Sequence, residues 1–425
     1  MNNWQQGVVG DLAHGVRGVS YRPEHLLSSY APEAVVLLRS TNIQGGSISF
    51  ESLQFVPSFL VSNEQRVNQH DIVVCMSNGS KTLVGKSAPC KTQFRDLLTV
   101  GAFCSVFHPH AGVHPSFVAH VFNGDGFRRN IDVTLAGSAI NNLRNCDIER
   151  FFCLIPDQNE QSRIAAVLDT VDEAIVQTEK VIAKLRQVRT GLLHDLLTCG
   201  LDENGQLRDP VAHPEQFQDT PLGLIPKAWK IASLVSQISF PEGQVDPRID
   251  PYCSWTLIAP DHVESGTGTL LARVTALQQG AISGKYMCEP DDVIYSKIRP
   301  YLRKAVLATE RGLCSADMYP LRPNEGIDSR FLLAVVLSEA FTRFASAVSM
   351  RSGFPKINRD EMAGFATGWP DSGEQKRIAD TLAAADAETS ECAKELAKLQ
   401  QLKSGLMDDL LTGRVRVPEG VCCGG

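Results

Sequence analysis

The chain has 425 residues, 43% of them hydrophobic and 21% charged, so we expect two or three domains with proper cores. It has no apolar run of membrane length, no signal-peptide core, and twelve scattered cysteines without a Cys-x-x-Cys pair; this argues against a membrane protein, a disulfide framework and a zinc site, and predicts a cytoplasmic protein. The net charge of −7 weighs mildly against nucleic-acid binding without excluding it, because binding depends on where the basic residues lie.

Residues 1–155 are predicted to form a first mixed α+β domain. Short apolar runs typical of strands occur at Ala34–Leu38, Ile72–Met76 and Phe103–Phe107. Within the following region, His108, His110 and His114 have a spacing that could bind a metal ion, but prolines break any helix that would align them. We interpret them as ordinary loop histidines.

A basic run in this domain extends from Ser77 to Arg95 and contains no acid. Asn78-Gly79 is a strong turn sequence, so we expect Ile72–Met76 and Thr82–Ser87 to pair as a hairpin suited to phosphate contact. The candidate contact residues are Lys81, Lys86, Lys91 and Arg95.

The segment Pro156–Thr198 is repeated, without a gap, at Pro370–Thr412. About 20 of the 43 positions are identical at a constant offset of 214 residues. Proline and acidic residues at both starts are typical of a helix N-terminus, and we interpret Glu160 and Glu374 as supporting it through dipole and capping effects. Two copies of so long a period indicate a duplicated module.

Each repeat carries a narrow apolar stripe with alternating steps of three and four residues. This heptad pattern predicts two long helices that pair with each other as an antiparallel coiled coil; two separate amphipathic core helices are the alternative. The first stripe is Ile164, Leu168, Val171, Ile175, Thr178, Ile182, Leu185, Leu192 and Leu196, and the second is Ile378, Leu382, Ala385, Thr389, Cys392, Leu396, Leu399, Leu406 and Leu410.

Residues 199–220 are polar and rich in Pro, Gly and Asp, as expected of a linker. Residues 221–368 are predicted to form a second mixed domain with strands near Trp255–Ala259, Val293–Ser296 and Ala305–Ala308, followed by a helix at 369–412 and a tail at 413–425. The run Val293–Val306 repeats the basic character of the first domain, with Lys297, Arg299, Arg303 and Lys304. Each basic run alone would be interpreted as a solvated surface, but their recurrence in both halves favours DNA contact.

Catalytic motifs are weak. Pro370–Lys376 resembles a metal-nuclease signature, but Asp371 and Glu374 lie three residues apart on one helix start, and the first copy lacks the lysine. Phosphate-binding loops, dinucleotide fingerprints and amino-methyltransferase tetrapeptides are absent from the sequence. We therefore predict no chemistry by this chain alone, and no metal or cofactor of its own.

The combined motifs resemble the DNA-specificity subunit of type I restriction–modification systems. These are Pro-Asp-x-x-Glu-Gln-x-Arg-Ile-Ala at both helix starts, Gly-Leu-x-x-Asp-Leu-Leu-Thr at both ends, and Ile-Pro-x-x-Trp opening the second half. Trp4 stands in place of that opener in the first half, without the preceding proline, so the start of the first domain is open.

The resemblance implies two target-recognition domains, each reading half of a split double-stranded DNA target, separated by two antiparallel helices. It implies docking of two modification subunits on these helices, near Glu160, Gln161, Arg163, Glu374, Gln375 and Arg377. S-adenosylmethionine would reside in those partners, and ATP and Mg²⁺ in restriction subunits where present. The alternatives are an autonomous DNA-binding regulator and, less favoured, a Mg²⁺-dependent nuclease.

Overall fold

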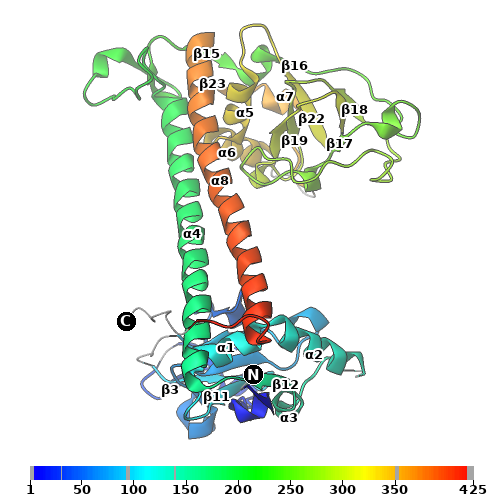
Figure 1. Ribbon diagram of the computed structural model, residues 1–425. Coiled ribbons are helices and arrows are strands. Elements are labelled where there is room, and N and C mark those ends of the chain that lie inside the picture. The colour runs from blue at the N-terminus through cyan, green and yellow to red at the C-terminus, as the bar shows by residue number, and fades with distance from the viewer. Residues whose placement is uncertain (1–3, 30, 92–95, 138–139, 350–353, 419–425) are drawn as a thin grey trace. The chain divides into compact units, whose positions relative to one another are not determined.

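The computed structural model describes residues 4–29, 31–91, 96–137, 140–349 and 354–418 (Figure 1). It divides into two compact units, one of residues 1–180 and 393–425 and the other of residues 181–392. Each unit contains one mixed domain, the first part of one long helix and the last part of the other. The predicted α+β class with an internal repeat is confirmed.

Two four-stranded sheets build the first domain, with strand orders β2-β11-β8-β9 and β6-β3-β10-β7. Strands β3 and β8 are rich in valine and buried throughout, which suits β-branched residues at the centre of a sheet. The elements are β1 Gln5–Val8, β2 Ala13–Arg17, β3 Ala34–Leu38, β4 Ile43–Gln44, β5 Ser47–Ile48, β6 Gln54–Pro57, β7 Arg66–Val67, β8 Ile72–Cys75, β9 Ser87–Pro89, β10 Leu98–Val100, β11 Cys104–Pro109, α1 Pro115–Asn123, α2 Asp125–Ala136, α3 Asn145–Glu149 and β12 Phe152–Ile155.

The second domain contains a four-stranded sheet, β16-β22-β19-β20, and a three-stranded sheet, β17-β21-β18. Its elements are β13 Phe217–Thr220, β14 Gly223–Pro226, β15 Lys230–Ser233, β16 Ile238–Ser239, β17 Leu257–Ile258, β18 Tyr286–Cys288, β19 Val293–Ser296, β20 Ala305–Leu307, β21 Gly312–Cys314, β22 Met318–Pro323, α5 Ser329–Leu337, α6 Glu339–Ser349, α7 Arg359–Met362 and β23 Ala366–Trp369.

The two domains share one topology. The sheet β2-β11-β8-β9 corresponds to β16-β22-β19-β20, and each domain also has a parallel pair, β3–β10 or β17–β21, flanked by an antiparallel strand. The antiparallel pairs β1–β12 and β15–β23 join the beginning of each domain to its end. The sequence repeat of the helices therefore extends to domains whose own sequences have diverged.

Most predicted strands are present, but the predicted hairpin is shifted. Strand β8 pairs with β9, which begins at Ser87, whereas residues 81–83 form a 3-10 turn, so the prediction of a strand at 82–87 is wrong. Gly85 explains the shift, because its φ of +82° is left-handed and a Cβ there would lie 2.0 Å from Ile131 Cδ1. The return strand begins only after this tight position.

The long helices are α4, Gln158–Thr198, and α8, Ser372–Leu411. In the first unit Asp172 binds Lys403 at 2.5 Å, and the start of α4 reaches Arg416 beyond the end of α8. In the second unit Arg189 binds Asp386 at 2.5 Å, and the start of α8 reaches Arg208 beyond the end of α4. Within each unit the two helix segments are therefore antiparallel (Figure 1).

These two ion pairs are equivalent under the repeat, since Asp172 and Asp386, and likewise Arg189 and Lys403, differ by 214 positions. The predicted stripe also faces inward, because all of its positions on both helices are buried or half-buried. The pairing of the two copies, rather than two independent core helices, is confirmed in each unit.

In each unit one apolar cluster joins the domain to residues of the long helices. Phe107, Phe117 and Leu168 belong to one cluster, and Tyr295, Phe331 and Leu382 to another. Among the described residues, no single helix is long and apolar enough to cross a membrane; only the bent pair α5–α6 meets those limits jointly, and most of α5 is buried in the second cluster.

Candidate nucleic-acid interface

At the start of α4, Glu160 joins both ends of the described chain. Its carboxylate, 1% exposed, accepts a hydrogen bond from the indole Nε1 of Trp4 at 2.8 Å and an ion pair from Arg416. Arg416 also lies over the Trp4 ring, with 5.3 Å from its Cζ to the ring centroid. A charge this deeply buried requires such partners.

The start of α8 repeats the arrangement. Glu374 accepts from Trp229 Nε1 at 3.1 Å and from Arg208 at 2.6 and 3.0 Å. Gly200, with φ of +67°, allows this approach, because a Cβ there would lie 2.3 Å from Glu374 Oε1. We call each carboxylate with its tryptophan and arginine a helix-start lock. Trp4 thus occupies the place of Trp229, which answers the question of the first-domain opener.

The neighbouring glutamines tie each domain to its helix. Gln161 Oε1 accepts from the backbone N–H of His114 at 2.8 Å, and Gln375 Oε1 accepts from that of Asp328 at 2.9 Å. His114 and Asp328 precede α1 and α5 and are themselves 214 residues apart. The glutamines therefore hold the same helix in both domains.

Capping differs from the prediction. The backbone N–H groups of Glu160 and Glu374 donate to the carboxylates of Asp157 and Asp371, both at 2.9 Å. The aspartates are thus the caps, whereas the glutamate carboxylates serve the locks. This also gives Asp371 a structural role in the segment that resembled a nuclease signature.

Most of the predicted docking residues are buried. The glutamates and glutamines are 1–3% exposed, and side chains this buried leave no surface for a partner. Arg163 and Arg377 are half-buried, and each has a buried Nε without a hydrogen-bond partner among the described residues. Docking near the helix starts stays a prediction, and the exposed helix faces are better placed for it than the four buried residues.

The basic residues predicted in the second domain have different environments. Arg303 donates to the carbonyl of Leu337, and Lys304 Nζ donates to that of Pro260 at 2.6 Å. Lys297 is only 7% exposed, and its Nζ lies 4.7 Å from the ring centroid of Tyr319. Arg299 is exposed. Arg303 and Lys304 are thus held by backbone carbonyls, whereas Arg299 is exposed and lies over the Phe354 ring.

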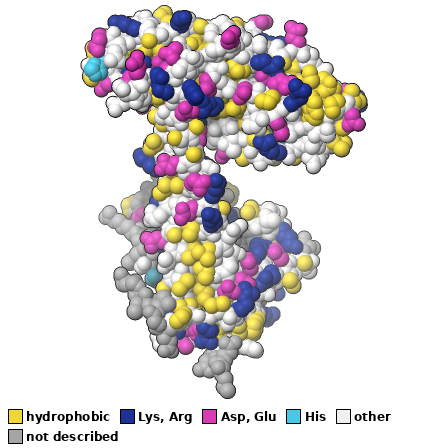
Figure 2. All heavy atoms as spheres, turned by 45° about the horizontal axis from the view of Figure 1, so that its top comes forward, with side chains coloured by type: hydrophobic (Ala, Val, Ile, Leu, Met, Phe, Trp, Pro, Cys, Tyr) yellow, Lys and Arg dark blue, Asp and Glu magenta, His cyan; other side chains and the backbone are white. Residues whose placement is uncertain are grey.

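In the first domain, Lys81 and Lys91 are exposed and Lys86 is half-buried, while Arg95 lies outside the described residues. No ion pair involves Lys81, Lys86 or Lys91 within the described ranges. Lysine and arginine side chains do not gather into one field on the face shown in Figure 2, where they lie among aspartates and glutamates. The distribution of charge on this face therefore does not single out a DNA-binding surface.

Sequence reasoning missed Lys356 and Arg359 in the second domain. Arg359 lies over two aromatic rings, with its Cζ 4.6 Å from the Phe240 centroid and 5.4 Å from that of Tyr319. Burial lowers the pKa of Lys297, and the positive charge of Lys356 lowers it further. Three of the six residues in Phe354–Arg359 are basic or aromatic, and this composition could have marked the segment as a candidate. Its proximity to Lys297 depends on the tertiary structure and could not be predicted from the sequence.

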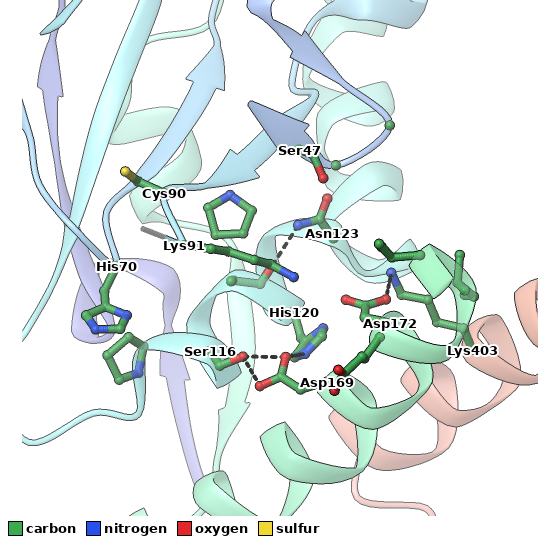
Figure 3. Close-up of a pocket in the computed structure, with 18 of the residues that line it drawn as sticks. Ser47, His70, Cys90, Lys91, Ser116, His120, Asn123, Asp169, Asp172 and Lys403 are labelled. Carbon is green, nitrogen blue, oxygen red and sulfur yellow. Dashed lines mark hydrogen bonds and ion pairs between the residues drawn. The ribbon is translucent and has the colours of Figure 1, made fainter. Parts of the chain in front are cut away.

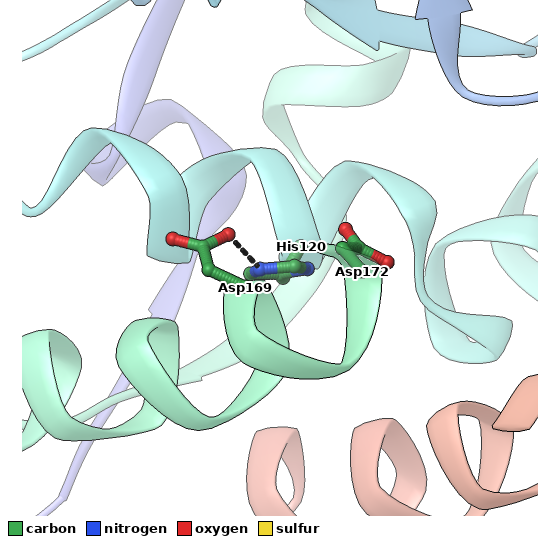
Figure 4. Close-up of side chains that lie close together, drawn as sticks. All are labelled: His120, Asp169 and Asp172. Atoms are coloured by element: carbon green, nitrogen blue, oxygen red, sulfur yellow. Dashed lines mark hydrogen bonds and ion pairs between the residues drawn. The ribbon is translucent and has the colours of Figure 1, made fainter. Parts of the chain in front are cut away.

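A cavity of about 590 Å³ lies in the first unit beside α1 and α4 (Figure 3). Asp169 projects into it from α4 between Ser116 and His120, which bind it at 2.6 and 2.9 Å, and Lys403 binds Asp172. His120, Asp169 and Asp172 offer ligand atoms within 4.8 Å of one another (Figure 4). However, the ammonium group and the two hydrogen-bond donors already satisfy both carboxylates, so the cluster needs no cation.

The interpretation as loop histidines is wrong for His108, which lies on β11, and His108 and His110 have ordinary partners. His108 binds Asp71 at 2.9 Å and the carbonyl of Glu64, and His110 binds the carbonyl of Gly10. His108 and His110 also pack against His14 on β2. These three imidazoles are held by sheet packing, while His114 precedes α1.

Comparison with known proteins places the chain. It is 30% identical over 303 residues to the type I restriction enzyme EcoDI specificity subunit of Escherichia coli, covering 66% of each chain. It is 34% identical over 185 residues to the StySPI specificity subunit of Salmonella potsdam, covering 44% of this chain and 39% of that one. The chain belongs to the type I restriction enzyme specificity subunits. The aligned regions span less than two thirds of these relatives.

No family model matches the chain. Solved structures share the fold over nearly the full length. A chain from a type I restriction–modification system, solved for its complex assembly and conformational transition, has a TM-score of 0.57 at 14% identity and covers 98% of this specificity subunit and 99% of its own length. The S subunit from M. genitalium has a TM-score of 0.54 at 14% identity, with 97% of both chains covered.

Proposed function

We propose that the chain is the non-catalytic DNA-recognition subunit of a type I restriction–modification complex. Each domain reads one half of a bipartite double-stranded target. The observation that carries this proposal is the duplication: two domains of one topology, with different surface residues, are attached to the helices by the same lock and the same glutamine bond.

Two modification subunits dock on α4 and α8 in this proposal. Val188 and Leu402 are 214 residues apart and each is 51% exposed, so equivalent apolar side chains face solvent once per repeat. Equivalent surfaces suit two copies of one partner. The partners carry S-adenosylmethionine, and restriction subunits, where present, carry ATP and Mg²⁺; reading host DNA places the complex in the cytoplasm.

Exchange of the second domain tests independent reading. Residues 230–365 would be replaced by those of a related specificity subunit, leaving Trp229, Arg208 and Glu374 in place so that the lock still forms. Mapping of adenine methylation in a host with the matching methyltransferase should show a change in one half of the target only, because base contacts lie within a domain.

The matched control replaces the exchanged segment with its own sequence recoded at the gene level. Changes in both halves would contradict independent reading. A wild-type complex that assembles and methylates without sequence preference would overturn the proposed function itself.

A further inference from the structure

At the end of β19 in the second domain, a distant segment pairs with the chain. Ile298 forms a β-bridge with Lys356, the N–H of Ile357 donates to the carbonyl of Lys297 at 2.9 Å, and the N–H of Arg299 donates to that of Pro355 at 2.8 Å. We call residues 297–299 with 355–357 the strand-end pairing of this domain. Arg299 and Lys356, one from each segment of the pairing, are both exposed.

The first domain has the same strand-end pairing, formed by residues 76–78 and 141–143 after β8. Ser77 forms a β-bridge with Asn142, the N–H of Leu143 donates to the carbonyl of Met76 at 2.8 Å, and the N–H of Asn78 donates to that of Asn141 at 3.3 Å. Every bond matches its counterpart in the second domain. The bonds make Asn78 equivalent to Arg299, and Asn142 equivalent to Lys356.

The second pairing concentrates positive charge on aromatic rings. Lys297 and Arg359 lie over Tyr319, and the Arg299 Cζ lies 4.6 Å from the ring centroid of Phe354. Within the described parts of the chain, no carboxylate forms an ion pair with Lys297, Arg299, Lys356 or Arg359. Positive groups clustered in this way repel one another, although the carboxylate of Asp317 partly offsets the charge of Lys297, and an electron-rich ligand would relieve that repulsion.

The first pairing presents carboxamides instead. Asn142 is exposed and its Oδ1 accepts from Arg17 at 3.1 Å. Asn78 is half-buried, and its amide donates to Ser40 Oγ at 3.5 Å and accepts from the N–H of Ser80 at 3.0 Å. Carboxamides have both a donor and an acceptor, and the bidentate partner that they match in the major groove is adenine. Arginine and lysine match the O6 and N7 acceptors of guanine.

We propose that the strand-end pairings are the base-reading sites, with Asn142 reading an adenine in one half of the target and Arg299 and Lys356 reading a guanine in the other. This inference rests on the proposed function and assigns its specificity. It explains how two domains of one topology recognise different half-sites.

The backbone of Arg299 supports the assignment. Its φ of 47° lies in the left-handed region, which side chains other than glycine seldom adopt. Strained residues persist where the surroundings hold them and are concentrated at binding and active sites. Arg299→Gly should therefore leave folding intact, because glycine prefers this conformation, while removing the side chain that the proposal needs.

The test uses the complete complex with its methyltransferase subunits and maps the methylated sequence in host DNA. Arg299→Gly combined with Lys356→Asn should relax or change one base of the half read by the second domain. Asn142→Lys should do so in the other half. Lys227→Asn combined with Lys230→Asn also removes two exposed positive charges from the second unit; it is the control and should leave both halves unchanged.

Binding measurements cover variants that no longer methylate. The affinity of each assembled complex for the wild-type target is compared with that for targets altered by one base in either half. Discrimination should fall about tenfold or more in the affected half and stay unchanged in the other.

Suppose that the wild-type complex methylates a split target and that the well-folded variants keep the same target sequence and the same discrimination. That result would overturn the inference and leave the proposed function intact. Loss of discrimination in both halves would overturn the inference as well. Failure of the proposed function would instead appear in the wild-type complex, as methylation without sequence preference.

Discussion

Glu160 and Glu374 occupy the same repeat position and are equally buried, yet their arginine partners differ in exposure. The Arg208 side chain is 14% exposed and the Arg416 side chain 42%. Losing one member of a buried pair leaves a charge without either a partner or water, whereas a more exposed arginine can be hydrated. The two helix-start locks should therefore contribute different amounts to the free energy of unfolding.

Glutamine substitutions test this difference with little change in shape. Glu374→Gln should lower the free energy of unfolding by about 3 kcal/mol, as expected when a buried pair is broken. Glu160→Gln should cost about 1 kcal/mol, the scale of a partly exposed interaction. Denaturant unfolding followed by circular dichroism and tryptophan fluorescence gives both values, and equal losses would contradict the role of arginine exposure.

At the scale of elements, the first helix after the sheet is held to a long helix by different chemistry in the two units. In the first, Ser116 and His120 of α1 bind Asp169 of α4. The second unit has Ala334 and Ala383 where His120 and Asp169 stand, and there Arg330 of α5 binds Asp380 of α8 at 2.6 Å. The attachment persists although its residues have changed.

Burial alone would raise the pKa of Asp169, but hydrogen bonds from His120 and Ser116 bring it below its ordinary value of 3.8. A carboxyl group with a lowered folded pKa stabilises the protein above its unfolded pKa and loses that contribution as pH falls through the folded value. Asp169→Asn should therefore destabilise the chain at pH 5, and the difference from the wild type should shrink as the pH falls below about pH 4.

His120→Ala and the double variant complete the cycle, with an expected coupling of about 0.5–3 kcal/mol for groups in direct contact. Additive effects of the two substitutions would show that the contact contributes no stability. Alanine is the matched replacement for His120, because the second unit has Ala334 at the equivalent position.

Elements with strong periodicity could be predicted from the sequence, whereas contacts between residues far apart in the chain could not. The stripe of α4 and α8 is a local pattern, so the helices and their pairing followed from spacing. The locks did not, because Trp4, Glu160 and Arg416 are brought together only by the fold. Likewise the basic run gave Lys297 and Arg299, while Lys356 comes from 57 positions beyond Arg299 through a single β-bridge to Ile298.

At the scale of the whole molecule, α4 and α8 connect two readers of DNA in the proposed function, so their length should be coupled to the spacing of the half-sites. The repeat gives both helices the same stripe, and each unit has one inter-helix ion pair at an equivalent position. A change made equally in both helices would preserve those contacts, whereas a change in one helix would shift them.

One heptad inserted between Lys180 and Val181, and another between Lys394 and Glu395, leaves Asp172–Lys403 and Arg189–Asp386 on their own sides of the insertions. Seven residues lengthen a helix by about 10 Å, which matches about three base pairs at 3.4 Å each. Three base pairs also rotate the duplex by about 100° at about 10.5 pairs per turn, so methylation should move to sites with a longer spacer or weaken if the domains cannot follow that rotation. The measurement is the spacer length of methylated sites, with the single insertion in α4 as the control that breaks the register. An active double insertion that still methylates the original spacer would show that the helices do not measure the gap.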